Sequence, residues 1–457
     1  MSQTAKPTPA TGADNAGFQR TLTLGDLLFY GMVMLVPLSP FAVYGQVFDI
    51  SRGAPAQAYI LGLVCLIPTA FCFGDAIRRW PSSGSVFTFC AKGLSTGAGF
   101  VGGWMLLLQY LVYPDLMYIL AGQALNQYVP EVPVWGWALL IMAFVTVVSL
   151  RKLKATVVVN RIALAGELVI VAMFVFFVVR RLVTVGPIMA DEAAALMADS
   201  DSSGLNVGAL FSAVSVCALS YLGFGSISTL TQEAKNPGRD PERATWLTVL
   251  VVGVLFIGEC LLAQLVDPSG NLFAHDASNG FYLVAGAVGG EWFGVLCAVG
   301  LALAMGVFSG LSSVVSVSRV LYIMARENAM PKRLAEFDQG TNSPRTASVF
   351  VAIVSIALLF LLLPLGMDAV TKVTNFGALA TYLMVDVAVL WFCWVKGHDR
   401  TRPFRLCVLP AFGALAIAVI LASFGAFAIG VGLGWCALGI IVYLVATRVF
   451  HVKMALG

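Results

Sequence analysis

The sequence predicts an all-helical membrane protein with twelve transmembrane helices, two of which are broken. Apolar residues make up 59% of the 457 residues and charged residues only 11%, whereas soluble domains average about 25% charged residues. Apolar segments long enough to cross about 30 Å of hydrocarbon recur along the whole chain. Two of these segments are interrupted at their centres, where nothing about solubility requires it.

Twelve apolar segments are candidate spans. Their approximate limits are 24–50, 55–78, 98–127, 133–150, 156–180, 207–232, 244–266, 290–324, 346–364, 367–395, 405–424 and 427–449. Residues 1–20 are polar and lack the apolar core of a signal peptide. We therefore expect them to be a disordered cytoplasmic tail, and the first apolar segment to be a retained span.

The distribution of basic residues predicts the orientation of these spans. If the N-terminus lies inside, 23 of the 27 Lys and Arg residues lie on the cytoplasmic side. The four on the outside are Arg52, Arg180, Arg181 and Lys372. Such an excess of positive charge marks the cytoplasmic side of a membrane protein. The sequence thus predicts a multi-pass protein of the cytoplasmic (inner) membrane with both termini cytoplasmic.

The two interruptions lie in the first and sixth spans. Pro37 and Pro40 interrupt the first, and Gly223 and Gly225 interrupt the sixth. Unpaired peptide groups are not tolerated against lipid, so an interrupted span must be buried in protein or line a watery cavity. A pair of such spans in corresponding places of two halves indicates the substrate site of a transporter.

The spacing of the interrupted spans predicts an inverted repeat. Their starts are five spans apart, an odd number, so the second unit enters the membrane upside down relative to the first. We expect one repeat in 21–182, a second in 207–396, and two additional helices in 403–450.

Three stretches between the spans resemble motifs of the amino acid–polyamine–organocation transporter superfamily. They are FGDAIRRWPSSGS at 73–85, QEAKNPGRDPERA at 232–244 and SRVLYIMARENAMP at 318–331. Within that family, Val-Pro at 36–37 and Asn-Phe-Gly-Ala at 375–378 are most similar to the putrescine-importer branch. The resemblance implies a five-plus-five inverted-repeat fold, alternating access, and a substrate bound between spans one, three, six, eight and ten.

The first interruption carries Pro37-Leu38-Ser39-Pro40-Phe41 where amino-acid carriers of this family usually have Gly-Ser-Gly. Free N–H groups at such a break suit a substrate carboxylate, and each proline removes one donor. An amine without a carboxylate is thereby favoured. The alternative is that the prolines only fix the kink, while Leu38, Ser39 and Phe41 still donate.

Two further spans carry candidate substrate residues. The resemblance places Gly225 where putrescine-type relatives have an acid, which argues against a plain diamine and leaves space for a bulkier substrate. Asp115 in span three is the candidate replacement, with Tyr118 on the same face; alternatively, Asp115 caps groups freed by Pro114. Aromatic side chains expected to line the cavity, with ordinary packing as the alternative for each, are Phe41, Tyr44, Tyr113, Tyr221, Phe224 and Phe308.

Glu167 in span five is the candidate coupling residue. Its surroundings are wholly apolar, and the three histidines lie in loops or tails, so a proton relay through the membrane must use carboxylates. A carboxyl group in an apolar span can bind a proton in the working pH range. The alternative is a cation, such as sodium, bound together with Ser312 and Ser313 of span eight.

Charged residues at the cytoplasmic ends of spans two and six form a candidate gate. Glu233 and Lys235 follow span six, and Asp75 and Arg78 follow span two. We expect a network of salt bridges between them that closes the cytoplasmic side.

These features predict a secondary transporter that imports a small organic amine or amino acid together with protons. The alternatives are an antiporter that exchanges a precursor for its decarboxylated product, and a channel or receptor with the same fold. An enzyme is not indicated, because the spans contain no nucleophile–histidine pair. The nine cysteines are scattered and indicate neither a metal site nor another cofactor. A net charge of +3 does not indicate a nucleic-acid partner.

Overall fold

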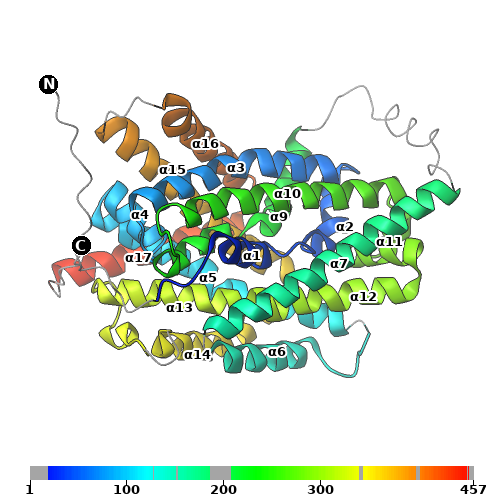
Figure 1. The fold of residues 1–457 in the computed structure, drawn as a ribbon, viewed down its shortest axis with the longest axis horizontal. Helices are drawn as coiled ribbons and strands as arrows, with labels where there is room; N and C mark the ends of the chain where they lie inside the picture. The colour runs from blue at the N-terminus through cyan, green and yellow to red at the C-terminus, as the bar shows by residue number, and fades with distance from the viewer. Residues whose placement is uncertain are drawn as a thin grey trace.

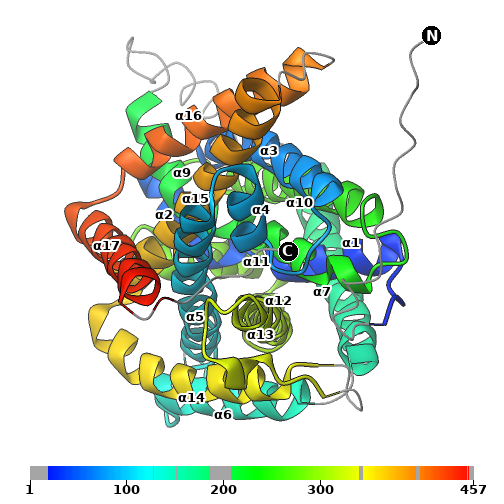
Figure 2. The ribbon, with the colours of Figure 1, turned by 90° about the vertical axis from the view of Figure 1, so that its left-hand side faces the viewer.

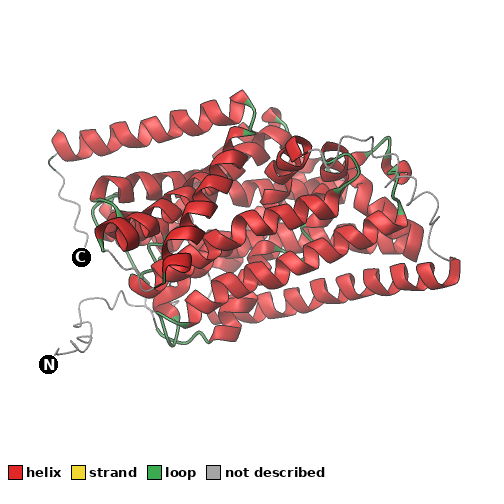
Figure 3. Ribbon diagram, turned by 90° about the horizontal axis from the view of Figure 1, so that it is seen from above, coloured by secondary structure: helices red, strands yellow, loops and turns green. Residues whose placement is uncertain are grey.

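The computed structural model describes most of the chain as a bundle of helices. The described residues are 19–126, 128–150, 153–185, 207–338, 343–397, 402–449 and 451. The predicted N-terminal tail, 1–20, lies almost entirely outside them. Figure 1 shows that most helices run along the long axis of the molecule, and Figure 3 shows helices joined by loops at the two ends of the bundle.

The principal helices run between the two ends of the bundle, and some spans consist of two successive helices. In chain order they are α1 (Leu24–Leu35), α2 (Pro40–Ile50), α3 (Pro55–Arg79), α4 (Val86–Gly93), α5 (Thr96–Asn126), α6 (Val134–Ser149), α7 (Leu153–Val185), α9 (Val207–Tyr221), α10 (Asp240–Val266), α11 (Gly280–Gly289), α12 (Glu291–Ala302), α13 (Gly310–Arg326), α14 (Arg345–Leu362), α15 (Met367–Leu390), α16 (Leu409–Ala422) and α17 (Ala426–Arg448). Short 3-10 and π segments join or extend them: η1 (Phe224–Glu233), η2 (Asn271–Phe273), η3 (Ala277–Asn279), η4 (Leu303–Ser309), η5 (Lys332–Ala335), η6 (Leu363–Leu365), η7 (Trp391–Lys396) and η8 (Phe404–Val408).

Length and composition confirm the membrane class of the described chain. Ten helices are long and apolar enough to cross a bilayer, and the bent pair α1 and α2 makes an eleventh span. The apolar helix α6 has only 16 residues and lies at the place of the fourth predicted span. The most apolar window of α5 is 89% buried and that of α17 only 17%, so α5 lies inside the bundle and α17 at its periphery (Figure 2).

The predicted break in the first span is confirmed. Helix α1 ends at Leu35 and α2 begins at Pro40, with a bend of 51° between them. Val36 has a φ of 53°, a left-handed conformation that the helix cannot continue. Pro40 occupies the first position of α2, where its missing N–H costs no helical hydrogen bond.

The sixth predicted span is also interrupted where the glycines predicted it. Helix α9 ends at Tyr221, and the chain resumes at Phe224 as the 3-10 helix η1. Gly223 has a φ of 111°, which a residue with a side chain rarely adopts. The interruption is therefore a change of helix type at a left-handed glycine.

We name the two ends of the bundle by what they contain. The α1 end is the end at which α1 begins and α3 finishes. The vestibule end is the opposite one, at which α2 and α5 finish and α11 lies.

Close packing at the vestibule end leads to a first prediction. A Cβ atom on Gly45 of α2 would lie 2.2 Å from the carbonyl oxygen of Ala277 in η3. Because this neighbour is backbone, Gly45→Ala should lower the thermal unfolding midpoint of the purified protein, as overpacking costs about 1–3 kcal/mol. Gly286→Ala in α11 is the matched control, since nothing lies within 4 Å of its Cβ position. An equal midpoint for the two variants would contradict this packing.

Candidate substrate site

The peptide groups freed by the first break are held by side chains of other helices. The Met34 carbonyl, the last but one in α1, accepts hydrogen bonds from the Tyr113 hydroxyl of α5 at 3.2 Å and from the Ser309 hydroxyl of η4 at 3.5 Å. Both hydroxyl-bearing residues are buried. The predicted site residue Tyr113 therefore lies at the break, and Ser309 is a further residue there.

The second break is held by Tyr382 of α15, which the sequence did not single out. The Gly223 N–H donates to the Tyr382 hydroxyl at 3.3 Å. The Tyr382 ring lies 4.6 Å from that of Phe224 and 5.3 Å from that of Phe73. A Cβ on Gly225 would meet Phe73 at 3.1 Å, so the space expected beside this glycine is filled by α3.

A hydrogen-bonded chain of hydroxyl groups joins the two broken spans. Ser39 donates to the Ser220 hydroxyl of α9 at 2.9 Å, and the Ser220 hydroxyl lies 3.0 Å from that of Tyr59. Pro37 lies in the turn that carries Ser39 towards α9. These buried bonds fix the two breaks against each other at mid-depth.

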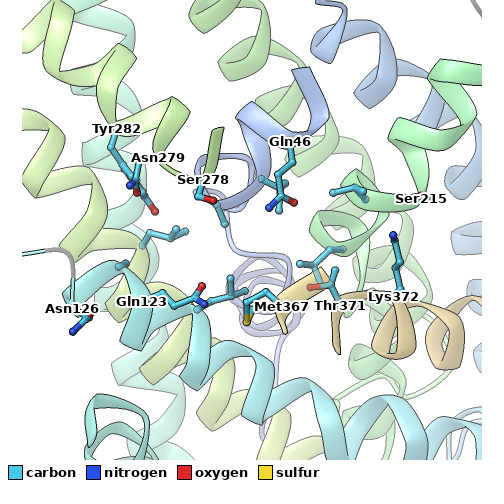
Figure 4. Close-up of a pocket in the computed structure, with 17 residues that line it drawn as sticks. Gln46, Gln123, Asn126, Ser215, Ser278, Asn279, Tyr282, Met367, Thr371 and Lys372 are labelled. Carbon is cyan, nitrogen blue, oxygen red and sulfur yellow. The ribbon is translucent and has the colours of Figure 1, made fainter. Parts of the chain in front are cut away.

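A cavity of about 380 Å³ opens above the breaks at the vestibule end (Figure 4). Its deep residues include Ala42, one turn after the first break, and Leu219, one turn before the second. The volume is typical of small-molecule sites. Its lining residues are Ala42, Val43, Gln46, Leu120, Gln123, Ala124, Asn126, Ser215, Val216, Leu219, Ser278, Asn279, Tyr282, Leu301, Met367, Thr371 and Lys372.

The polar groups of this cavity are amides, hydroxyls and one ammonium group. Figure 4 shows Gln46 of α2, Gln123 of α5 and Lys372 of α15 around it. Among its described lining residues there is no Asp or Glu. None of the predicted substrate residues lines it. The signal that sequence reasoning missed was Gln46 and Gln123, polar residues inside otherwise apolar spans.

Asp115 and Tyr118 lie away from the breaks. Asp115 is buried and faces Ser355 of α14, a helix at the outside of the bundle (Figure 2). The Tyr118 ring lies next to Asp115 and packs against Gly310 of α13. The structure thus places the candidate counter-charge between α5 and α14 and not beside the cavity.

The remaining predicted aromatics pack between helices. Tyr221 donates to the Tyr59 carbonyl at 2.8 Å, and Phe41 stacks on Phe281 of α11 with ring centroids 3.7 Å apart. Tyr44 contacts the same Phe281 ring edge-on. Phe308 lines a separate, wholly apolar groove of about 200 Å³ between α6 and η4. By position in the chain, Tyr221 and Phe224 flank the second break, and Phe41 directly follows the first.

Glu167 and the two serines of span eight occupy different levels of the bundle. Glu167 is buried next to the Leu38 backbone N–H at the first break. The Ser312 hydroxyl instead accepts from Asn160 at 3.0 Å, seven residues or about 10 Å along α7 from Glu167. Ser313 donates to the Ser309 carbonyl at 2.8 Å. The candidate cation site made from all three side chains is therefore not assembled here.

Ion pairs close the α1 end, with partners that differ from the expected ones. Glu233 pairs with Arg319 of α13 at 2.6 Å, and both side chains are almost wholly buried. Asp75 pairs with Arg405 at 2.9 Å and with Arg78 at 3.4 Å.

Two further contacts tie this end together. Arg405 also reaches Glu242 of α10 at 2.6 Å, so it bridges α3 and α10. Lys235 contributes its backbone N–H, which donates to the Leu22 carbonyl at 2.8 Å. Of the predicted gate residues, Glu233 thus holds a buried ion pair, Asp75 a partly exposed one with Arg405, Arg78 a longer one with Asp75, and Lys235 a main-chain contact.

Comparisons with known proteins cover almost the whole chain. A family model described as amino acid permease matches residues 29–449. The chain is 29% identical over 440 residues to the low-affinity putrescine importer PlaP of Escherichia coli K12, with 95% of each chain covered. It is 23% identical over 467 residues to the branched-chain amino acid permease BcaP of Bacillus subtilis, covering 96% of this chain and 95% of that one. It is also 23% identical over 465 residues to the methylthioribose transporter of Bacillus subtilis, with 94% of each covered.

The buried pair at the α1 end generates a second prediction. Glu233→Gln removes the carboxylate that the buried Arg319 guanidinium contacts at 2.6 Å, and breaking a buried ion pair costs about 3–5 kcal/mol. The control is Arg161→Gln. The Arg161 side chain is 52% exposed in its ion pair with Asp26, so this substitution should lower the free energy of unfolding by less than about 1 kcal/mol. Thermal unfolding in detergent should show a large loss only for Glu233→Gln. Equal losses would mean that the buried pair does not hold this end closed.

Proposed function

The chain belongs to the amino acid permease family, and from this premise we propose that it imports a small organic amine or amino acid by proton-coupled alternating access. The family consists of transporters, so the chain is not an enzyme. The observation that carries the proposal is the cavity at the vestibule end, whose lining reaches within one turn of each helix break, while the buried Glu233–Arg319 ion pair lies at the opposite end.

We infer the full twelve-span topology from the helices together with the family. Helix α6 supplies the fourth span, α1–α7 form the repeat predicted for 21–182, which the helices extend to Val185, and α9–α15 form the inverted one within 207–396. Helices α16 and α17, in 403–450, follow the repeats. The ion-paired α1 end is cytoplasmic in this proposal, because the basic residues gather there. Both termini are then cytoplasmic, and the vestibule opens to the outside.

The cavity favours a substrate that carries at most one positive charge. Lys372 is among its lining residues, and the described lining residues include no acid that would stabilise a second ammonium group. At the sixth span, Phe73 and Tyr382 fill the space beside Gly225. A zwitterionic amino acid or a monoamine therefore suits the cavity better than the diamine transported by the E. coli relative.

Proton coupling is proposed to act through Glu167. Its carboxyl group lies beside the break in the first span, where alternating access requires α1 to move relative to α7. A proton fits this place better than sodium, because the hydroxyls of Ser312 and Ser313 bond to Asn160 and Ser309 instead.

Uptake into proteoliposomes tests this function. With an acidic exterior, radiolabelled neutral amino acids or monoamines should accumulate saturably, and a protonophore should abolish the accumulation. Flux that appears only as counterflow, without a gradient, would establish exchange. Non-saturable flux would indicate a channel. If putrescine were the best substrate, the proposal that the substrate carries at most one positive charge would be wrong.

A pair of variants tests the placement of the site. Tyr382→Phe removes the acceptor of the Gly223 N–H, and an unsatisfied buried amide costs about 1–3 kcal/mol. We expect substrate uptake, measured as kcat/KM, to fall about tenfold or more. Asp115→Asn, which acts between α5 and α14, should leave KM within about twofold. A large KM increase for Asp115→Asn alone would indicate that the substrate binds beside Asp115 and not in the cavity.

A further inference from the structure

Helix α1 lies on a row of buried serines of α13. The Ser313 hydroxyl lies 3.8 Å from the Met34 sulfur, close to the first break. One turn nearer the α1 end, Tyr30 of α1 contacts Ser312 and Ser316. Residues three and four apart lie on the same side of a helix, and Ser312 and Ser313 precede Ser316 by four and three residues. The first half of the broken span therefore covers one polar face of α13.

The Tyr30 hydroxyl makes two short hydrogen bonds to this face. It donates to the Ser312 carbonyl at 2.7 Å, and its oxygen lies 2.7 Å from that of the Ser316 hydroxyl. A phenol has a single proton, so the Ser316 hydroxyl must be the donor in the second bond. Tyr30 is 3% exposed and both serines are 0% exposed, so the contact is out of reach of water.

The same level of α13 also holds α7. The side-chain amide of Asn160 donates to the Ser312 hydroxyl at 3.0 Å, so Tyr30 and Asn160 tie two helices to one residue. Tyr30 is one turn of α1, about 6 Å, before the carbonyl held at the break. The buried pair of Arg319 and Glu233 lies a further turn along α13 towards the α1 end. The Tyr30 contact is thus the layer between the break and the ion pair.

The α13 side of this contact can be released at little cost. The Ser312 carbonyl is also the helical partner of the Ser316 N–H, because α-helical bonds join residues four apart. The Ser316 hydroxyl can rotate to that same carbonyl, as serines inside helices do. Only the Tyr30 hydroxyl loses its partners when α1 moves away, and water that enters the gap replaces them. The contact is therefore suited to repeated breaking and formation.

We propose that Tyr30 is a latch that holds α1 on α13 while the vestibule is open, and that its release uncovers the serine face at the α1 end. The proposal rests on the proposed alternating access and adds a positioning residue to it. Tyr30 is not among the lining residues of the cavity, so it acts through the position of α1. Once uncovered, the serine hydroxyls offer hydrogen bonds to a polar substrate on its way from the break to the cytoplasm.

Removal of single hydroxyl groups tests the latch. Tyr30→Phe removes both hydrogen bonds to α13 and keeps the ring. In lipid nanodiscs, hydrogen–deuterium exchange of the α1 amides should rise about three- to tenfold, the range that a buried hydrogen bond supports, while exchange in α17 stays unchanged. Tyr44→Phe, in the other half of the same broken span, is the matched control. In the described structure the buried Tyr44 hydroxyl has no hydrogen-bond partner, so α1 exchange should keep its wild-type value.

Transport kinetics separate a latch from a residue that only supports the fold. Without the latch, fewer molecules hold the vestibule open, so the apparent KM for external substrate should rise about threefold or more in Tyr30→Phe. Ser316→Ala leaves the Tyr30 bond to the Ser312 carbonyl in place and should raise KM less. The double variant should equal Tyr30→Phe, because both changes act on one contact.

Three outcomes would contradict these proposals. Equal α1 exchange in Tyr30→Phe and Tyr44→Phe would overturn the latch and leave the proposed import intact. A rise in exchange in all helices, with a lower unfolding midpoint and an unchanged KM, would assign Tyr30 a role in the fold alone and would also overturn the latch. Absence of saturable uptake by the wild type would instead overturn the proposed function, since the exchange measurement needs no substrate.

Discussion

The need to hydrogen-bond peptide groups that a helix has released determines the centre of this protein. A break in a membrane span frees carbonyl and amide groups that lipid cannot satisfy. Here the Met34 carbonyl is held by Tyr113 and Ser309, and the Gly223 amide by Tyr382. These side chains come from α5, η4 and α15, so two local interruptions fix the positions of three helices that are distant in the sequence. The cavity lies farther towards the vestibule end, lined by later residues of α5 and earlier residues of α15 than those that hold the breaks.

Different physical interactions hold the helices together at the two ends of the bundle. Buried ion pairs such as Glu233–Arg319 join helices at the α1 end, whereas stacked rings such as Phe41 and Phe281 pack α2 against α11 near the vestibule. Separating a buried ion pair is inexpensive only if water replaces each partner. Stacked apolar rings instead prefer to remain out of water. In the proposed alternating access, the α1 end would open by hydration of these charges, and the vestibule end would close by apolar packing.

The sequence predicted the fold better than the site, for physical reasons. Paired prolines and glycines at the centre of an apolar segment disfavour a continuous helix, so both breaks were predicted within a few residues, although the single prolines Pro68 and Pro114 lie inside α3 and α5. The direction in which a side chain points depends on the rotation of its helix about its own axis, which the sequence does not specify. Tyr113 and Asp115 are two residues apart, about 200° around α5, so they cannot face one cavity. The π-helical turn η4 changes the helical phase before Phe308, and no sequence signal marked it. The partner of Glu233 is Arg319, 86 residues away, a pairing that only the tertiary fold creates.

The orientation of Leu38 connects the break to the question of which group the substrate presents. Pro37 and Pro40 remove two amide donors from the break, and Leu38 between them retains one. That donor faces Glu167, so a carboxylate of the protein occupies the position in which a free amide would otherwise hold an anion. A substrate carboxylate must then be recognised elsewhere. Gln46 and Gln123 line the cavity above, and their side-chain amides could donate to such a group. In the proposed mechanism, the break thus serves coupling, and the vestibule serves recognition.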